Sequence, residues 1–179
     1  QAKEVVVSDW GGASTTAFKA SWEQLLASKY GIKLTMESSG AAPGKIRAMV
    51  ESGKVIWDVC DTSSGGTFQL GEAGLLEEID YSIVDKTKAR PEFVFKYGVC
   101  NYMFSYVMAV NSEKFPKDRQ PRTWADFYDL KKFPGRRTMR ALVEGQLEGA
   151  LLADGVAPKD LYPLDVERAL AKINTIKAQ

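Results

Sequence analysis

The chain has 179 residues, and its 24 basic and 23 acidic side chains leave a formal net charge of +1. This balance gives neither the basic surface that binds nucleic acid nor a cationic arm for an anionic membrane, and no apolar run reaches the roughly 20 residues that span a bilayer. The sequence contains no histidine, which excludes His-activated nucleophiles and His-based zinc sites within this chain.

The first third of the chain alternates strand and helix patterns. The predicted elements are a strand at Glu4–Ser8, a helix from about Thr15 to Ser28, a strand at Ile32–Glu37, a helix beginning near Pro43 and a strand at Val55–Cys60. Strands that alternate with helices of this length predict right-handed βαβ units and a parallel sheet covered on both faces. We therefore expect an α/β fold with three layers, αβα.

Two glycine-rich stretches follow the first and third of these strands. They read Trp10-Gly11-Gly12 and Ser63-Ser64-Gly65-Gly66. Ligands of parallel sheets bind beyond the carboxyl ends of the strands, where both stretches would lie. Either loop alone is better explained as a tight connection, but two at one edge favour a binding site. Neither matches a phosphate-binding motif, so nucleotide binding is not supported.

The stretch from Tyr97 to Asn111 is predicted to be a long buried strand, because its residues are almost all apolar, aromatic or β-branched. A strand of this length can serve one sheet at its start and another at its end. It therefore predicts a crossing between two lobes with a cleft between them. Further along the chain, Thr123 and Asp126 form a capping box that predicts the start of a short helix. The remaining predicted elements are a strand at Gly135–Arg140 and helices at Gln146–Asp154 and from Asp165 to about Lys177.

Several motifs in this part of the chain resemble the hinge region of periplasmic solute-binding proteins of ABC importers. They are Tyr102-Met103-Phe104, Ala109-Val110-Asn111, and Thr123-Trp124-Ala125-Asp126-Phe127 followed by Phe133-Pro134-Gly135, and the later Ala150-Leu151-Leu152-Ala153-Asp154-Gly155 matches the family as well. The closest branch is the spermidine/putrescine-binding type, with the type II periplasmic binding fold. The resemblance implies a first ligand-binding lobe at residues 1–105, and a hinge crossing with an incomplete second lobe at 106–179.

The resemblance also implies how the protein works. It predicts an extracytoplasmic protein of the periplasm, with its signal peptide removed, that delivers a small organic solute from an interlobe cleft to an ABC transporter permease. Relatives usually continue well beyond this length, so we expect an amino-terminal portion. The second lobe is then expected to expose strand edges and an apolar face that the missing segments would cover, and to pair with another copy.

The relatives' ligand positions can be compared with this chain residue by residue. Trp10 matches an aromatic residue that packs on the methylene chain of a polyamine, and Ser63 and Ser64 match hydroxyl residues. Gly65 and Gly66 stand where relatives have tyrosines, and Leu142 and Gly145 stand where they have carboxylates. These departures argue against a polyamine.

The remaining groups suit an anion. Hydroxyls and backbone amides at a helix start bind carboxylates, and Arg136, Arg137 and Arg140 could clamp one, although they could equally be solvent-facing charges. The solute is therefore either polyamine-like or carboxylate- and amino-acid-like. The predicted ligand-binding residues are Trp10, Gly11, Gly12, Ser63, Ser64, Gly65, Gly66, Tyr106 and Arg140.

No catalytic residue, metal ligand or cofactor is predicted. The alternative is an enzyme on the same two-lobed fold, which would use a lysine or carboxylate with a perturbed pKa inside the cleft. In the oxidising compartment that the resemblance implies, Cys60 and Cys100 could form a disulfide, and two buried thiols are the equal alternative.

Overall fold

The computed structural model describes residues 2–177, which fall into two compact units on either side of the Met103–Phe104 bond. Gln1 and residues 178–179, which the predicted lobes 1–105 and 106–179 include, lie outside the described residues.

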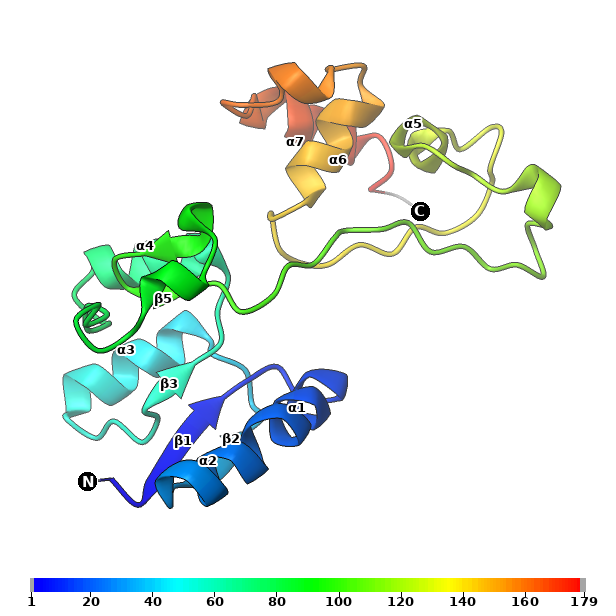
Figure 1. Cartoon of the computed structure of the whole chain (residues 1–179). Helices are drawn as coiled ribbons and strands as arrows, with labels where there is room; N and C mark the ends of the chain where they lie inside the picture. The colour runs from blue at the N-terminus through cyan, green and yellow to red at the C-terminus, as the bar shows by residue number, and fades with distance from the viewer. Residues whose placement is uncertain (1, 178–179) are drawn as a thin grey trace. The chain divides into compact units, whose positions relative to one another are not determined.

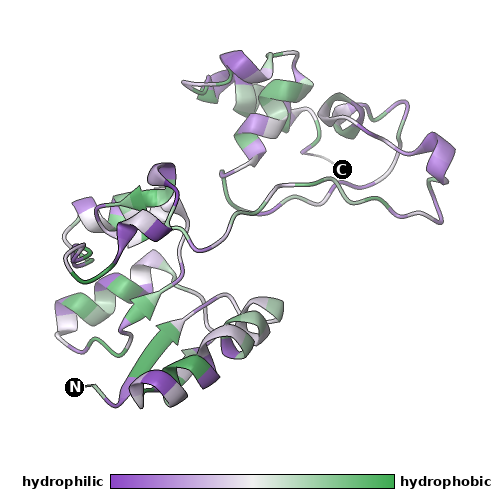
Figure 2. Cartoon of the chain, in the orientation of Figure 1, coloured by the Kyte–Doolittle hydropathy of each residue, from purple (hydrophilic) through white to green (hydrophobic). Residues whose placement is uncertain are grey.

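The first unit is built on a sheet of three parallel strands (Figure 1). These are β1 (Glu4–Ser8), β2 (Lys33–Glu37) and β3 (Val59–Cys60), in the order β2-β1-β3. Val5 pairs with Leu34 and Val7 with Val59, so these residues share one face of the sheet. The hydrophobic colour of β1 in Figure 2 fits its central position, where both faces are covered.

Helices cover the two faces of this sheet. Val6 and Cys60 point to the face on which α3 (Pro43–Ser52) and α4 (Ser64–Glu72) pack, around a core of Ala41, Ile46, Trp57 and Leu70. The other face, which carries Leu34, is covered by one continuous helix. It consists of α1 (Ala13–Phe18), the π-helical segment η1 (Lys19–Glu23) and α2 (Gln24–Tyr30). The predicted αβα architecture of the first lobe is confirmed.

The rest of the first unit has little regular structure. It contains the 3₁₀ turns η2 (Lys86–Lys88) and η3 (Pro91–Phe93) and a short antiparallel hairpin of β4 (Val94–Phe95) and β5 (Gly98–Val99). The hairpin packs on α4 through the edge-to-face pair of Phe68 and Phe95, whose ring centroids are 5.6 Å apart.

Two predicted strands are wrong. Residues 100–111, which follow β5, form an extended segment without a strand. Residues 136–140 form a second extended segment without a strand. The predicted strand at Val55–Cys60 is reduced to β3. Alternation with period two indicates an extended backbone, but a strand also needs a ladder of hydrogen bonds to a neighbouring strand. Within residues 2–177 neither segment belongs to a sheet, and the Cys100 amide makes a single such bond, to the Phe93 carbonyl.

The second unit is helical in its described part. Its elements are η4 (Lys117–Arg119), α5 (Trp124–Tyr128), α6 (Gln146–Ala153), η5 (Pro158–Asp160) and α7 (Val166–Asn174). Helices α6 and α7 pack closely because Ala150 and Ala169, both fully buried, present only methyl groups. The remaining buried members of this core are Tyr128, Leu147, Leu151 and Ile176.

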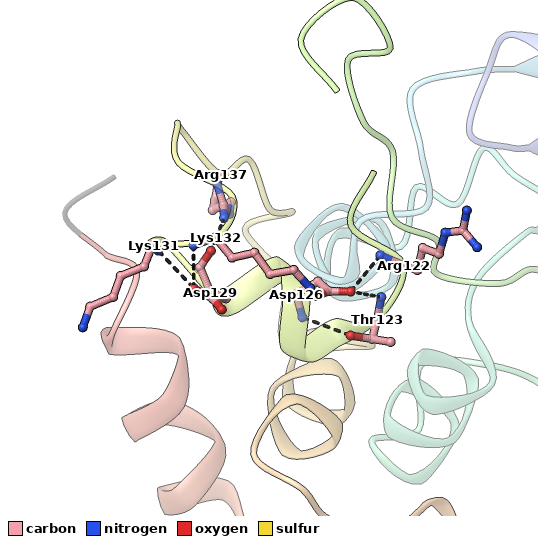
Figure 3. A network of polar contacts seen from close by, with 7 residues as sticks. All are labelled: Arg122, Thr123, Asp126, Asp129, Lys131, Lys132 and Arg137. Atoms are coloured by element: carbon pink, nitrogen blue, oxygen red, sulfur yellow. Dashed lines mark hydrogen bonds and ion pairs between the residues drawn. The ribbon is translucent and has the colours of Figure 1, made fainter. Parts of the chain in front are cut away.

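A polar network holds both ends of α5 (Figure 3). At its start, Thr123 Oγ1 accepts a hydrogen bond from the Asp126 amide at 3.0 Å, and the Asp126 carboxylate accepts the Thr123 amide at 3.2 Å. This is the capping box that the sequence predicts. The carboxylate also accepts the Arg122 amide and pairs with Lys132, and these bonds lower the pKa of Asp126 to about 2.

Arg137 holds the other end of the helix and the turn that follows it. Its guanidinium donates to the carbonyls of Phe127 at 2.7 Å and Gly135 at 2.8 Å, and also to that of Phe133. The sequence left open whether Arg137 clamps a ligand carboxylate or faces solvent; the structure shows that its guanidinium donors bond within the fold.

None of the helices within residues 2–177 combines the length and the apolar character that crossing a membrane requires.

Candidate functional site

The strands β1 and β3 each end on an aspartate. Asp9 follows β1 and Asp61 follows β3, and the Asp61 amide donates to the carbonyl of Ser8 at 2.8 Å. The two carboxylate residues therefore lie at neighbouring ends of the parallel sheet, at the edge where ligands of such sheets bind. Asp9 is fully buried, whereas Asp61 is partly exposed.

The carboxylate of Asp9 is used within the first unit. Thr15 Oγ1 donates to Asp9 Oδ2 at 2.6 Å, and the Gly11 amide donates to Asp9 Oδ1 at 3.3 Å. The Thr15 hydroxyl also lies 2.9 Å from the hydroxyl of Ser38. Asp9 thus joins the loop after β1 to the start of α1, and Thr15 connects both to the loop after β2.

Trp10 lies next to this buried group and is half exposed, with 51% of its surface accessible. Its ring lies over Gly40, where an added Cβ would be 3.4 Å from two ring carbons. Gly11 and Gly12 have φ of +81° and +62°, a left-handed backbone that favours glycine. The residue predicted as an aromatic wall is therefore a half-exposed ring that lies over Gly40, on a turn that favours these glycines.

Asp61 is paired with a residue that the sequence assigned only to the hinge. The hydroxyl of Tyr102 donates to Asp61 Oδ2 at 2.8 Å, and the Tyr102 ring lies 6.2 Å from that of Phe18 between centroids. Burial raises the pKa of Asp61, the bond from Tyr102 opposes the rise, and the charge of Asp9 adds to it. Burial and the bond to Asp61 raise the pKa of Tyr102 to about 12.

No cation of the described chain neutralises these two carboxylates. Among residues 2–177, neither Asp9 nor Asp61 forms an ion pair with a lysine or arginine. The same residues contain no group of three or more Cys, Asp or Glu side chains that could hold a metal. The partly exposed Asp61 is thus an acceptor at which an organic cation could supply the missing charge.

The second predicted loop is largely the start of a helix. Ser63 is the N-cap of α4, and its hydroxyl accepts the Gly66 amide at 3.1 Å. A Cβ on Gly66 would lie 2.5 Å from Thr62 Oγ1, so this position needs glycine. Ser64 and Gly65 form the exposed first turn of α4. The Gly66 amide, predicted to hold the polar end of a ligand, is already bonded inside the helix.

In the second unit, Tyr106 and Arg140 lie together. Arg140 Nη1 donates to the Tyr106 hydroxyl at 3.4 Å, and the guanidinium carbon is 6.0 Å from the ring centroid. Phe104 packs edge-on against Tyr106 with 5.4 Å between centroids. Arg140 is exposed and makes one long hydrogen bond within residues 2–177, so most of its donors are unused there, in contrast to those of Arg137.

The disulfide that the sequence left open is not formed. Both cysteines are free thiols, and Cys100 Sγ donates to the carbonyl of Tyr102 at 2.9 Å. Burial, with a smaller effect of Asp61, raises the pKa of the Cys60 thiol.

Sequence reasoning missed Asp9, Asp61 and Tyr102 as members of this site. A signal was present, since both β1 and β3 run directly into an aspartate at the edge where ligands bind. A hollow near the start of β2, lined among others by Lys3, Gly31 and Lys33, contains none of the predicted ligand-binding residues.

Comparison with known proteins adds a family to this geometry. The family model described as bacterial extracellular solute-binding protein matches residues 15–179. A protein of Pseudomonas aeruginosa named gamma-aminobutyric acid-binding protein is 34% identical over 183 aligned residues, covering 99% of this chain and 51% of that protein.

Solved structures of other proteins are similar to this chain as well. An ABC transporter substrate-binding protein from Bradyrhizobium japonicum is 41% identical with a TM-score of 0.89, covering 99% of this chain and 55% of that one. A structure titled Atu4243-GABA receptor is 41% identical with a TM-score of 0.84, covering 98% of this chain and 54% of that one. The chain thus spans about half the length of the relatives it matches. The resemblance inferred from the hinge motifs is confirmed, and the chain belongs to the bacterial extracellular solute-binding proteins.

Proposed function

We propose that this chain acts in an ABC importer as its extracytoplasmic solute-binding component, works in the periplasm with a transporter permease, and binds a small amino-acid-like solute. Two of the relatives carry gamma-aminobutyric acid, or GABA, in their names. GABA has an ammonium group at one end and a carboxylate at the other. The groups described in each unit match these two kinds of charge.

The observation that carries the proposal is the accessible aromatic ring of Trp10 at the same sheet edge as the unneutralised carboxylate of Asp61. An ammonium group is attracted both to a carboxylate and to the face of an indole ring, and its methylene carbons pack on that ring. The first unit therefore supplies the groups that bind the cationic end of a solute.

Arg140 in the second unit supplies the opposite chemistry. Its exposed guanidinium can bind a carboxylate with two parallel hydrogen bonds, and the Tyr106 hydroxyl beside it offers a further polar contact. A polyamine would instead need a second carboxylate, and Leu142 and Gly145 stand where that group is expected. An amino acid therefore fits better than a polyamine.

The same groups favour binding over catalysis. Asp61 has the raised pKa that an enzyme would need, but its hydrogen-bond partner Tyr102 has a pKa of about 12 and remains protonated at neutral pH. The neighbouring thiol of Cys60 has a raised pKa as well, which makes it a poor nucleophile. The site offers an anion and an aromatic wall without an activated nucleophile, and we propose that the protein is not an enzyme.

The test is isothermal calorimetry with GABA, α-amino acids, small carboxylates and putrescine. We expect GABA or another amino acid to bind, and Trp10→Ala and Arg140→Gln each to weaken binding by about 1 to 3 kcal/mol. Arg136→Gln is the matched control, since Arg136 is exposed and makes no hydrogen bond or ion pair within residues 2–177. Tight binding of putrescine alone, or of an amino acid with no effect of either variant, would refute the assignment.

We also propose that copies of this chain associate. β3 is an edge strand of two residues, and the apolar side chains on it and before it are exposed, with accessible fractions of 52% for Val59, 58% for Val55 and 59% for Ile56. Such an edge can pair with a second copy. Sedimentation velocity should show dimers that Val59→Lys dissociates, and a monomer at every concentration contradicts the proposal.

A further inference from the structure

Asp9 is the only residue with an ionisable side chain among the fully buried residues of the described chain, and it lies beside the ring that we assign to the solute. Its exposed fraction is 0%, so its carboxylate cannot touch a ligand in this arrangement. A buried carboxylate without a cation is costly unless its oxygens accept hydrogen bonds. Both oxygens do so, one from Thr15 Oγ1 and one from the Gly11 amide.

Both bonds join Asp9, the residue before Trp10, to residues that follow it, and so hold the backbone around Trp10. The Gly11 amide belongs to the peptide that follows Trp10, and its bond to Asp9 Oδ1 closes a turn around the tryptophan. The bond from Thr15 ties the same carboxylate to the first turns of α1. The turn that presents the indole is thus closed from inside by the side chain that precedes it.

The backbone of Asp9 fixes the surface on which the ring lies. Its carbonyl accepts the Gly40 amide at 2.9 Å, and its amide donates to the carbonyl of Glu37 at 3.1 Å. Gly40 is the residue under the Trp10 ring, where a Cβ would come within 3.4 Å of it. Asp9 therefore holds both the turn that carries the indole and the glycine that supports it.

We infer that Asp9 is a positioning residue that sets the orientation of the Trp10 ring, and that the affinity for the solute depends on its two side-chain hydrogen bonds. The second part rests on the proposed function, in which Trp10 contacts the solute. The first part does not, because the orientation of the ring can be measured without any solute.

The central comparison is between two substitutions of the same residue. Asp9→Asn keeps one carbonyl oxygen for the Gly11 amide and offers an amide donor to Thr15 Oγ1, which can still pair with Ser38. Asp9→Ala removes both acceptors, so the partly buried Gly11 amide loses this partner and the Thr15 hydroxyl keeps only Ser38. If only the negative charge of Asp9 mattered, both substitutions would impair the protein equally, because both remove it. If Asp9 positions Trp10 through hydrogen bonds, asparagine should preserve the wild-type behaviour.

The ring is monitored by fluorescence in the absence of solute. The chain has four tryptophans, so the Trp10 signal is taken as the difference between each protein and its Trp10→Phe counterpart. In Asp9→Ala, we expect this signal to shift to longer wavelength and acrylamide quenching to increase, while Asp9→Asn stays near the wild type. Asp85→Ala is the control, because Asp85 accepts an amide and a threonine hydroxyl in the same way, both from Thr87, at an exposed turn of the same unit.

Affinity for GABA is then measured by calorimetry, with an expected loss of about tenfold for Asp9→Ala and less than threefold for Asp9→Asn. If the Trp10 signal of a folded Asp9→Ala protein equals that of the wild type, the positioning role is refuted, whatever the affinity. If Asp9→Ala does not fold, Thr15→Val replaces it, since it removes only the hydroxyl donor. An unchanged Trp10 signal in that variant refutes the inference equally. A changed Trp10 signal together with unaltered GABA binding refutes only the link to the solute.

Discussion

The hydroxyl of Tyr102 donates a 2.8 Å hydrogen bond to Asp61, 41 residues earlier in the chain. The bond connects the last part of the first unit to the end of its third strand. It also places a neutral donor on the carboxylate that we assign to the cationic end of the solute.

Replacing Tyr102 with phenylalanine should raise the pKa of Asp61 further, because the bond from Tyr102 is what opposes the effect of burial. We expect a loss of about 1 kcal/mol in the free energy of unfolding. Carbon-detected NMR titration, with Asp61 assigned by Asp61→Asn, checks the pKa. Tyr30→Phe is the control, since Tyr30 is similarly exposed. An Asp61 titration that is the same in wild type and Tyr102→Phe would contradict the role of the bond.

The raised pKa of Asp61 fixes the sign of a pH effect on stability. The folded state holds a proton that the unfolded state, with a value near 3.8, releases. The stabilisation is therefore complete below 3.8 and is lost as the pH rises through the folded pKa. Urea unfolding of wild type and Asp61→Asn should show the variant gaining in relative stability as the pH rises from 3.8 through the folded pKa of Asp61. A difference that does not change with pH would rule this out.

The stability of the second unit should change with pH in the opposite direction, because of Asp126. Its pKa is lowered from 3.8 to about 2, so its hydrogen bonds stabilise the fold above 3.8 and are lost as the pH falls towards 2. In Asp126→Asn, the part of the acid-induced loss of stability that occurs between pH 3.8 and about 2 should disappear. Circular dichroism of the acid unfolding transition measures it, and identical transitions for the two proteins would show that the capping network does not titrate.

Arg137 is expected to matter for stability. Arg137→Gln removes bonds from a charged donor to the carbonyls of Phe127, Phe133 and Gly135, and should lower the free energy of unfolding by about 2 to 4 kcal/mol. Arg137→Lys keeps the charge but not the planar arrangement of donors, and should recover little of the loss. Urea unfolding with Arg136→Gln as control is the measurement. Equal midpoints for the two glutamine variants would show that the bonds from Arg137 to these three carbonyls contribute nothing.

The cysteines give a chemical test. When the protein is purified without reductant, its mass should be that of the chain with both cysteines reduced, and alkylation should add two groups. Cys60 should react slowly, since burial raises the pKa of its thiol and reduces the thiolate fraction. A mass lower by two hydrogens, with no alkylation before reduction, would establish a bridge.

The sequence predicted the helices and the parallel strands because each shows a repeating pattern of apolar residues. The 3.6-residue period of Ile46, Met49 and Val50 indicates a helix regardless of its partners. The pattern at Tyr102 to Val110 indicates only an extended backbone, and whether a neighbouring strand is present depends on residues elsewhere in the chain. This is why the crossing segment was expected as a strand.

The sequence predicts where a candidate site lies but not how its side chains are arranged. Trp10 and Ser63 follow β1 and β3 at the edge where ligands of parallel sheets bind, and their contact with a ligand stays a prediction. Which arginine remains available could not be predicted, since Arg137 and Arg140 look alike in sequence and differ only in the carbonyls that surround them. The orientation of the Asp9 carboxylate, turned inward to Thr15, depends likewise on the packing of a loop.

Gly145 has consequences for how this protein can vary. It has φ of +74°, and a Cβ there would lie 2.3 Å from the ring of Tyr106. Any other side chain would therefore have to displace the ring against which Arg140 lies. In a library of variants selected for new solutes, position 140 should accept many replacements and position 145 hardly any. Changes in ligand preference should then arise at the guanidinium, while the glycine that makes room for its aromatic neighbour stays constant.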